Sequence, residues 1–442
     1  MTYSDVKKLG EGGFAIVMQV QEDSTGVNFA KKIYSPQKHL VTVVGDEHLK
    51  KRFKREVRYQ KSLNHPNIVQ IVEENLDDEP PSFIMPLAIG TMSDDIKTRQ
   101  QTGWDPKKSL FDILAGLEAL HAAGFVHRDL KPANVLKFNN NGSIDYAISD
   151  FGLITGDHGD STTLTGSNDG GGTPNYAAPE LLRGFKTATH LADIYSFGAI
   201  LHDIYSNNTI RIPYTELNIP GELGPIITKC TKSLPIRRYS NISALREDLY
   251  NVLNTTTITF NSSDEKMVVD LLNLKNELTE SEWDSVYTIL DYNIDKKNNI
   301  HNIFSSLRES HIKQLSIESP ELLVAVGVMF ADFINNNAFN FDYCDILASK
   351  AGLFYELGDI QLKAKIALAT LELGTSHNRW YVERKFVSMV GVDIPEQLAK
   401  RIAIEIDVQE FEFKRKFSHL SSSIGVEIEI LHPILQKKLN DI

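Results

Sequence analysis

Two short polar motifs in the first half of the chain constrain its fold more than any other feature of the sequence. The first is His-Arg-Asp-Leu-Lys-Pro-Ala-Asn at residues 127–134, and the second is Asp-Phe-Gly at residues 150–152. The probability that both arise by chance, in this order, is negligible. They supply carboxylate and amide oxygens, which are the donors that Mg²⁺ takes in proteins, commonly together with phosphates.

The N-terminal stretch has the alternation of β-strands. Apolar and polar residues alternate over 6–20 and again over 27–33, and residues 22–26 between them favour a turn, so a β-hairpin is predicted. A glycine-rich segment at 10–17 lies in a second turn. Glycines let main-chain N–H groups face phosphate oxygens. An ordinary hairpin turn explains a lone glycine-rich segment better, so the residues downstream must decide.

Helices dominate after this β-rich part. A helix is predicted over 50–63, because the His-Pro-Asn turn at 65–67 ends it. Two short apolar runs, at 68–72 and 83–87, extend the β-rich part. Farther on, apolar residues recur at a spacing of three and four and predict a buried helical stripe, formed by Leu110, Ile113, Leu114, Leu117 and Leu120. A small β-rich lobe therefore precedes a larger helical one.

In order and spacing, these motifs resemble the protein kinase family over residues 1 to about 254. The resemblance implies an α+β fold of two lobes, a β-rich N-lobe and a helical C-lobe, with ATP and Mg²⁺ as cofactors. It identifies the glycine-rich segment as a nucleotide-binding loop, although Ala15 stands where a third glycine is common. The nucleotide-binding residues that it implies are Leu9, Gly10, Glu11, Gly12, Gly13, Phe14, Ala15, Val17, Lys32 and, at the hinge, Ala88.

The same resemblance assigns the chemistry of the two motifs. It implies that Asp129 accepts the proton of the substrate hydroxyl and that Lys131 is a partner of the γ-phosphate. Lys32 would reach the α- and β-phosphates, and Glu56 would pair with Lys32 when the site is assembled. Two magnesium ligands are also implied, Asn134 and Asp150.

The segment after the second motif resembles the part of the kinase family that seats a peptide substrate. Gly-Thr-Pro-Asn-Tyr at 172–176, called the seating motif below, argues against a small-molecule phosphotransferase. Asp193 is expected to support the catalytic loop, and Arg238 to pair with Glu180. The Lys-Pro pair at 131–132 is similar to that of Ser/Thr kinases. The resemblance thus implies transfer of the ATP γ-phosphoryl group to Ser or Thr of proteins.

Regulation by autophosphorylation is a further hypothesis. Arg128 directly precedes the implied base. A phosphate on the activation segment, residues 153–178, can bridge such an arginine to Arg55 on the helix predicted over 50–63. Thr173 belongs to the seating motif and is better suited to contact the catalytic loop. The candidate acceptors that remain are Ser161, Thr162, Thr163, Thr165 and Ser167.

The second half of the chain is predicted to form a separate domain. A linker rich in Thr, Ser and Asn at 255–263 separates the kinase-like part, 1–254, from an all-α domain at 264–442. Five to eight helices are expected there. Ser262 with Glu265 has the form of a capping box, and Thr279 with Glu282 repeats it.

Charge and composition exclude several other classes. The net charge of -12 divides unevenly, because residues 1–254 carry 27 basic and 30 acidic groups (net -3) and the remainder 19 and 28 (net -9). This acidity argues against a nucleic-acid partner. The N-terminus has no signal-like pattern and no stretch has the length of a membrane span, so no membrane and a cytoplasmic location are expected. The two cysteines, Cys230 and Cys344, have neither metal-ligand nor disulfide spacing.

Two other functional classes were weighed against an active kinase. A pseudokinase would bind nucleotide as a scaffold, but such proteins typically lose an equivalent of Lys32, Asp129, Asn134 or Asp150, and all four are present. The C-terminal domain is alternatively a protein-binding module governed by the kinase, and the sequence does not rank this against a structural role. Histidines other than His127 are expected to be surface or packing residues.

Overall fold

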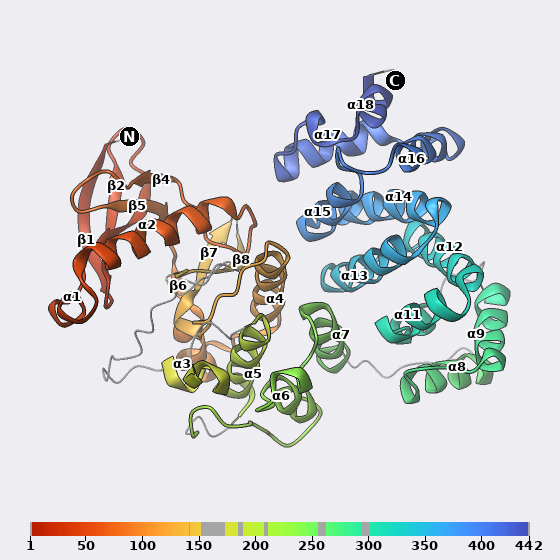
Figure 1. Ribbon diagram of the computed structural model, residues 1–442, viewed down its shortest axis with the longest axis horizontal. Coiled ribbons are helices and arrows are strands. Elements are labelled where there is room, and N and C mark those ends of the chain that lie inside the picture. The colour runs from red at the N-terminus through yellow and green to blue at the C-terminus, as the bar shows by residue number, and fades with distance from the viewer. Residues whose placement is uncertain are drawn as a thin grey trace. The chain divides into compact units, whose positions relative to one another are not determined.

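The computed structural model describes residues 2–140, 142–151, 173–183, 189–206, 211–254, 262–293 and 300–440. Contacts within the chain divide it into two compact units, Met1–Leu253 and Asn254–Ile442. The first unit begins with strands and continues with helices, and the second consists of helices (Figure 1). The kinase-like fold class and the helical C-terminal region are thus as the sequence predicts.

The N-lobe is built on a five-stranded antiparallel sheet with the order β1-β2-β3-β5-β4. The predicted hairpin joins β2 to β3, and its turn closes with Gly26 at a φ of 72°, which glycine adopts without steric cost. Val17 lies opposite Lys32 in this hairpin. The strands are β1 Tyr3–Glu11, β2 Ala15–Glu22, β3 Asn28–Tyr34, β4 Glu73–Asn75 and β5 Ser82–Pro86.

Two helices follow β3. The short α1 (Lys38–Val44) was not foreseen, and α2 (Asp46–Ser62) begins one turn earlier than the expected helix. The buried face of α2 packs against the N-lobe core through Leu49, Phe53 and Val57.

The prediction that the run 68–72 extends the β-rich part was wrong. Its residues do not form a strand, and the N-lobe strand in this region is β4. Ile68 is buried in the C-lobe core and Val69 in the N-lobe core, so this run passes from one core to the other.

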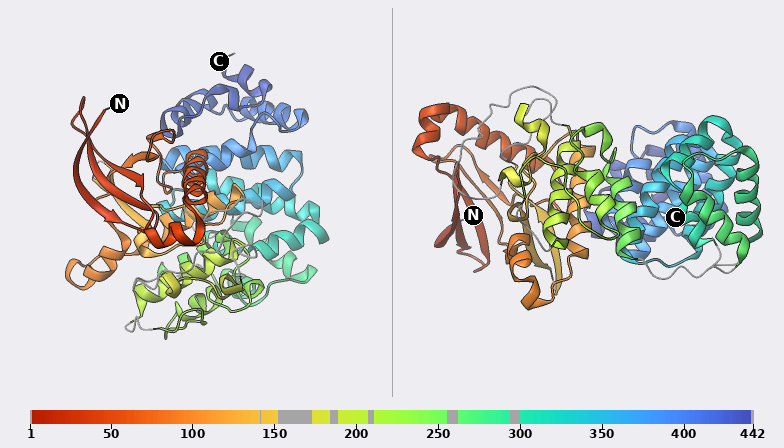
Figure 2. Two further views of the ribbon diagram at one scale, coloured as in Figure 1. Left: turned by 60° about the vertical axis from the view of Figure 1, so that its left-hand side comes forward. Right: turned by 90° about the horizontal axis from the view of Figure 1, so that it is seen from below.

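The C-lobe is mainly helical, with a small sheet of order β6-β7-β8 at its start. Its core includes the predicted stripe of α4, and α5 is buried along almost its whole length. The strands of the N-lobe, in red, and the helices of the C-lobe, in orange to green, can be followed in Figure 2. The elements are β6 Gly90–Thr91, α3 Met92–Thr102, α4 Lys107–Ala122, β7 Val135–Asn140, β8 Ser143–Ile148, α5 Leu191–Tyr205, α6 Gly224–Cys230 and α7 Ile242–Leu253.

The second unit contains eleven α-helices among its described residues, so the expectation of five to eight was too low. Short helices account for the difference, because a single turn or a proline divides what reads as one apolar segment. The helices are α8 Ser263–Leu274, α9 Glu280–Asn293, α10 His301–Ser306, α11 Glu309–Glu318, α12 Pro320–Asn336, α13 Phe341–Leu357, α14 Ile360–His377, α15 Trp380–Met389, α16 Glu396–Val408, α17 Phe413–Ile424 and α18 Pro433–Asn440.

Each predicted capping box forms only one of its two expected hydrogen bonds. At α8, the Ser262 hydroxyl accepts the N–H of Glu265 at 3.0 Å, but the Glu265 side chain accepts a hydrogen bond from Asn302 instead of closing the box. At α9, the Glu282 carboxylate accepts the N–H of Thr279 at 2.9 Å.

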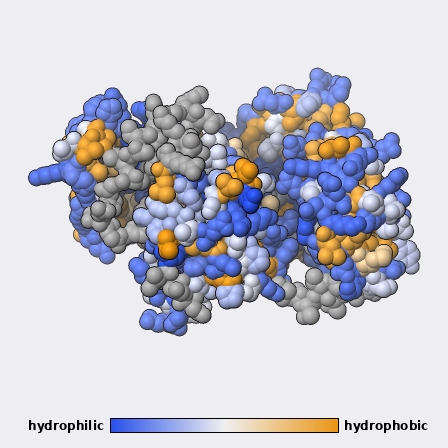
Figure 3. Space-filling view, turned by 60° about the horizontal axis from the view of Figure 1, so that its bottom comes forward, coloured by the Kyte–Doolittle hydropathy of each residue, from blue (hydrophilic) through white to orange (hydrophobic). Residues whose placement is uncertain are grey.

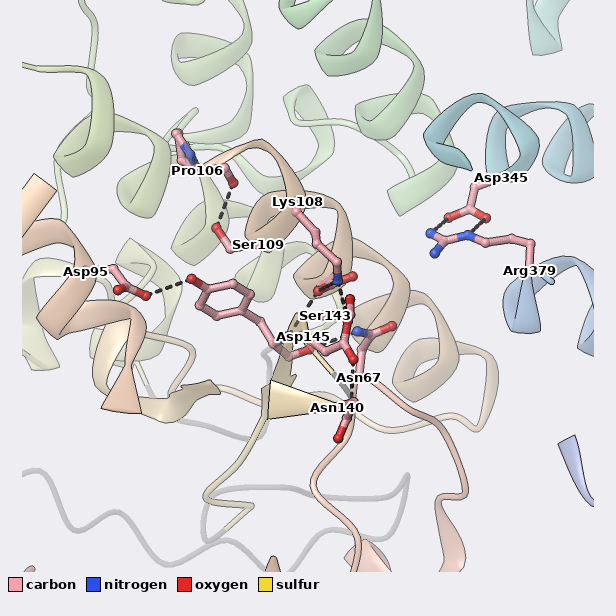
Figure 4. Close-up of polar contacts among 12 residues, drawn as sticks. Asn67, Asp95, Pro106, Lys108, Ser109, Asn140, Ser143, Asp145, Asp345 and Arg379 are labelled. Carbon is pink, nitrogen blue, oxygen red and sulfur yellow. Dashed lines mark hydrogen bonds and ion pairs between the residues drawn. The ribbon is translucent and has the colours of Figure 1, made fainter. Parts of the chain in front are cut away.

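The second unit has its own core around α14, which contacts α12, α13, α15, α16 and α17. Phe304, Phe330 and Phe354 pack ring against ring, with centroids about 5 Å apart. A buried bidentate ion pair joins Arg379 to Asp345 at 2.7 and 2.6 Å (Figure 4).

On the face shown in Figure 3, apolar residues form several separate groups among hydrophilic ones. Among the described residues, none of the helices combines the length and the apolar character needed to cross a bilayer.

Candidate active site

Three predicted site residues from three different elements meet in the first unit. The ammonium of Lys32, on β3, lies 2.7 Å from Glu56 Oε1 on α2 and 3.1 Å from Asp150 Oδ1, two residues after β8. The strand places Lys32 because alternate residues face the same side of a sheet, and the helix places Glu56 on the buried face that carries Phe53. The expected pairing of Lys32 with Glu56 is therefore present.

The Lys32 charge stabilises both carboxylates of this trio, whereas burial and the Asp150 charge raise the pKa of Glu56. Burial alone would lower the pKa of Lys32, but the carboxylates of Asp150 and Glu56 raise it above its ordinary value. The Lys32 charge lowers the pKa of Asp150 to about 2. At neutral pH the site thus holds an ammonium and, beside it, an ionised carboxylate.

The catalytic loop holds the other three predicted residues together. Lys131 Nζ lies 2.9 Å from Asp129 Oδ2, and Asn134 Nδ2 donates to the same oxygen at 3.2 Å and to the Asp129 carbonyl at 2.8 Å. Burial raises the pKa of Asp129, and the Lys131 charge opposes that rise. His127 links this loop to β8, because its Nε2 lies 3.0 Å from the carbonyl of Ser149.

The glycine-rich turn lies between β1 and β2. It closes with a hydrogen bond of 2.9 Å from the N–H of Gly12 to the carbonyl of Ala15, and a Cβ added at Gly10 would meet no atom within 4 Å. At its tip, the ring centroid of Phe14 lies 4.9 Å from the Arg52 guanidinium on α2. This cation–π contact ties the turn to the helix that carries Glu56, and no local sequence pattern predicts it.

The predicted hinge follows β5. Met85, 9% exposed, lies opposite Ala30 on the neighbouring strand, so its side chain projects on the same face of the sheet as Ala30 and Lys32. Pro86 is the last residue of β5, and Ala88 lies two residues beyond it, half-buried. The contact of Ala88 with adenine stays a prediction.

Asp193 supports the catalytic loop as expected. Its carboxylate, with no exposed surface, accepts the N–H groups of His127 at 2.9 Å and Arg128 at 2.8 Å. It also pairs with His121 Nε2 at 2.8 Å, so His121 is more than a packing residue. Burial opposes ionisation of Asp193, but these hydrogen bonds and the His121 charge hold its pKa below the ordinary value. A histidine at the end of a helix carries no sequence signal for such a role.

A polar network fixes the β7–β8 hairpin, which joins Asn134 to Asp150 (Figure 4). Asn67, from the His-Pro-Asn turn, donates to the Tyr146 carbonyl at 2.8 Å. The Tyr146 hydroxyl donates to Asp95 on α3 at 2.7 Å. Lys108 on α4 pairs with Asp145 at 2.7 Å. The hairpin that joins Asn134 to Asp150 is therefore anchored to α3 and α4 of the C-lobe.

The expected partners at the close of the activation segment are also present. Arg238 binds both oxygens of Glu180, at 2.7 and 2.8 Å. Residues 152–172 lie outside the described residues, and they include the hydroxyl cluster 161–167. The hypothesis of a phosphate between Arg128 and Arg55 is therefore still a prediction.

The oxygen donors fit a magnesium ion. Asp150 is ionised, and the Asn134 amide turns its nitrogen towards Asp129, which leaves its oxygen for a cation. Within the described part of the chain, no group of three His, Cys, Asp or Glu side chains could hold a metal by itself. Mg²⁺ does not need such a cage, because phosphates and water complete its shell.

Comparison with known proteins agrees with this geometry. The family model described as protein kinase domain matches residues 3–263. The carbon catabolite-derepressing protein kinase of Saccharomyces cerevisiae is 30% identical over 222 residues, which are 49% of this chain and 32% of that protein. A probable serine/threonine-protein kinase of Clostridium perfringens is 25% identical over 281 residues (59% and 39%). One of Dictyostelium discoideum is 36% identical over 205 residues (44% and 27%). The chain thus spans less than half the length of each of these relatives.

Proposed function

The chain belongs to the protein kinase domain family, and on that premise we propose that it transfers the γ-phosphoryl group of ATP to serine or threonine hydroxyls of proteins, including its own. The family implies an ATP-dependent phosphotransferase that acts on proteins. Two relatives whose names specify Ser/Thr kinases support the choice of acceptor. The single observation that carries the proposal is the contact of Lys32 with both Glu56 and Asp150.

In the proposed mechanism, the chain's own residues bind, orient and move a proton. Lys32 neutralises phosphate oxygens, and Glu56 keeps its ammonium in place. Asp129 accepts the proton of the attacking hydroxyl at its carboxylate. Its neighbour Lys131 opposes the rise that burial causes in the pKa of that carboxylate and offers a positive charge to the transferred group.

Magnesium has a defined place in this proposal. Asp150 and Asn134 would hold the ion through oxygen atoms, and when bound it neutralises phosphate charge. Asp150 contacts Lys32 as well, so the ion and the lysine would be fixed relative to each other.

The alternatives weighed from the sequence have different support. A pseudokinase is disfavoured, because Lys32, Asp129, Asn134 and Asp150 are all present. The contacts of Lys32 with Asp150 and of Asn134 with Asp129 support this choice. A protein-binding role for the second unit stays a proposal beside the kinase activity.

A direct test compares wild type with Asp129→Asn in the full chain, incubated with Mg-ATP and a general acceptor such as casein. Loss of the base is expected to lower turnover by about 10²- to 10⁴-fold. Binding of a non-hydrolysable ATP analogue should change little, because the phosphate-binding residues remain. Mass spectrometry of the wild type should find phosphate on serine or threonine, including the cluster 161–167. Turnover of the variant within a few-fold of wild type would contradict the assigned base.

A further inference from the structure

A buried arginine fastens the end of the seating motif to the C-lobe. Arg211 follows α5 in the chain, and its side chain is 4% exposed. Its Nε and Nη2 donate to the main-chain carbonyl of Asn175 at 3.1 and 3.0 Å. Its Nη1 pairs with the carboxylate of Asp203, near the end of α5. All three guanidinium nitrogens are thus engaged.

The next residue of the motif is held by the same group. The Tyr176 hydroxyl donates to the other oxygen of Asp203 at 2.5 Å, and the Tyr176 ring centroid lies 4.9 Å from the Arg211 guanidinium carbon. Ser196, also on α5, donates to the Tyr176 carbonyl at 2.8 Å. Two consecutive residues of the motif are therefore fixed through main chain and side chain together.

The positive charge of Arg211 is needed to hold Asn175, Tyr176 and Asp203 in this arrangement. Asp203 is 7% exposed, and a buried carboxylate that loses its partner is strongly destabilised. The neighbouring His202 does not replace it, because its Nδ1 lies 3.9 Å from Asp203 and burial lowers the pKa of its imidazole. Without Arg211, the Asn175 carbonyl would also lose both of its guanidinium donors.

We propose that Arg211 is a positioning residue for the protein substrate: it holds Asn175 and Tyr176 so that the acceptor segment meets a preformed surface. The inference rests on the proposed kinase function. At the far end of the same stretch Arg238 fixes Glu180, so residues 175–180 are held at both ends by arginines of the C-lobe. The described contacts of Arg211 are with the motif and α5, and none is with Lys32, Glu56 or Asp150.

This separation predicts which kinetic constant changes. In the full chain, Arg211→Ala is expected to raise KM for casein by about ten-fold or more. Loss of hydrogen bonds to a charged group would lower the population of the ordered seating motif by about that factor, and apparent affinity falls with this population. The dissociation constant of a non-hydrolysable ATP analogue with magnesium should stay within two-fold of wild type. Added guanidinium ion, at concentrations well below those that denature, should lower the casein KM of Arg211→Ala part of the way to the wild-type value. The same concentration of sodium chloride should not. Arg237→Ala, which removes an exposed arginine of the same lobe, is the matched control.

Arg211→Lys keeps a charge beside Asp203 but cannot make the fork to Asn175. It tests the inference if the alanine variant does not fold, and its casein KM should also rise. A folded variant whose casein KM matches wild type, or a loss of analogue binding that parallels the loss of casein phosphorylation, would overturn the inference. Wild-type protein that transfers no phosphate to casein or to itself would instead overturn the proposed function, and this inference with it.

Discussion

Two residues of the proposed site have positive backbone φ angles, which residues other than glycine rarely adopt. Arg128 has a φ of 69° and Asp150 a φ of 64°. Such left-handed conformations cost about 1–3 kcal/mol each and persist only where the surroundings fix them. For Arg128 the N–H bond to Asp193 does so, and for Asp150 the contact with Lys32. Neither angle can be read from residue type, because only a few per cent of residues other than glycine have a positive φ, even though aspartate is enriched among them.

The role of Asp150 can be tested through its metal. Replacing Asp150 by Asn should weaken the effect of magnesium on binding of a non-hydrolysable ATP analogue by at least about ten-fold, since even groups one step removed from a metal contribute that much. Titration calorimetry with and without magnesium measures this effect. Asp78→Asn, which alters an exposed carboxylate in the loop between β4 and β5, is the control. An undiminished magnesium effect in Asp150→Asn would remove Asp150 from the proposed ligands.

At the scale of elements, α2 links several parts of the site. Its buried face packs on the N-lobe sheet, and the same helix presents Glu56 to Lys32 and Arg52 to Phe14. A shift of α2 would therefore alter the lysine pair and the glycine-rich turn together. This coupling makes α2 the element through which the proposed activation-segment phosphate, bound at Arg55, would act.

Close helix packing in the second unit gives an element-scale prediction. A Cβ at Gly374 in α14 would lie 2.9 Å from Glu383 Cγ and 3.0 Å from Glu383 N on α15. Gly374→Ala should therefore destabilise this helix pair by about 1–3 kcal/mol.

Gly352 in α13 is the matched control, because a Cβ there meets no atom within 4 Å. Gly352→Ala should stabilise its helix by up to about 1 kcal/mol, since alanine loses less backbone entropy. Hydrogen exchange of the α13–α15 amides in the full chain measures both changes. Equal effects of the two substitutions would mean that α14 and α15 separate easily enough to accept the added methyl group.

At the scale of the whole molecule, the chain consists of two units with separate cores. The second unit buries its own aromatic cluster, including Phe304, Phe330 and Phe354, and its own ion pair of Asp345 with Arg379. A unit with its own core can in principle fold alone.

We therefore predict that residues 254–442, expressed alone, fold into a helical protein that unfolds cooperatively. Far-UV circular dichroism with a thermal scan is the measurement. Residues 1–254 expressed in parallel should keep the ability to bind an ATP analogue. A disordered spectrum for 254–442 would show that this unit needs the N-terminal one to complete its core.

The sequence by itself determined the family, the order of the two lobes and which residues to look for at the site. It did so because those residues lie in contiguous motifs whose spacing is visible along the chain. Lys32, Glu56 and Asp150 were identified in this way, as was the pairing of Lys32 with Glu56, whereas the contact of Lys32 with Asp150 was not. The helix count of the second unit was not, because short breaks between helices have weak local signals.

Only the tertiary structure decided the contacts that join motifs to the rest of the fold. These contacts join separate elements: His121 with Asp193, Arg52 with Phe14, and Arg211 with Asn175 and Asp203. A single arginine or histidine outside a motif has the same local sequence whether it faces solvent or a buried carboxylate. Its partner is set by the packing of distant elements, and the burial that this packing imposes makes the pairing necessary.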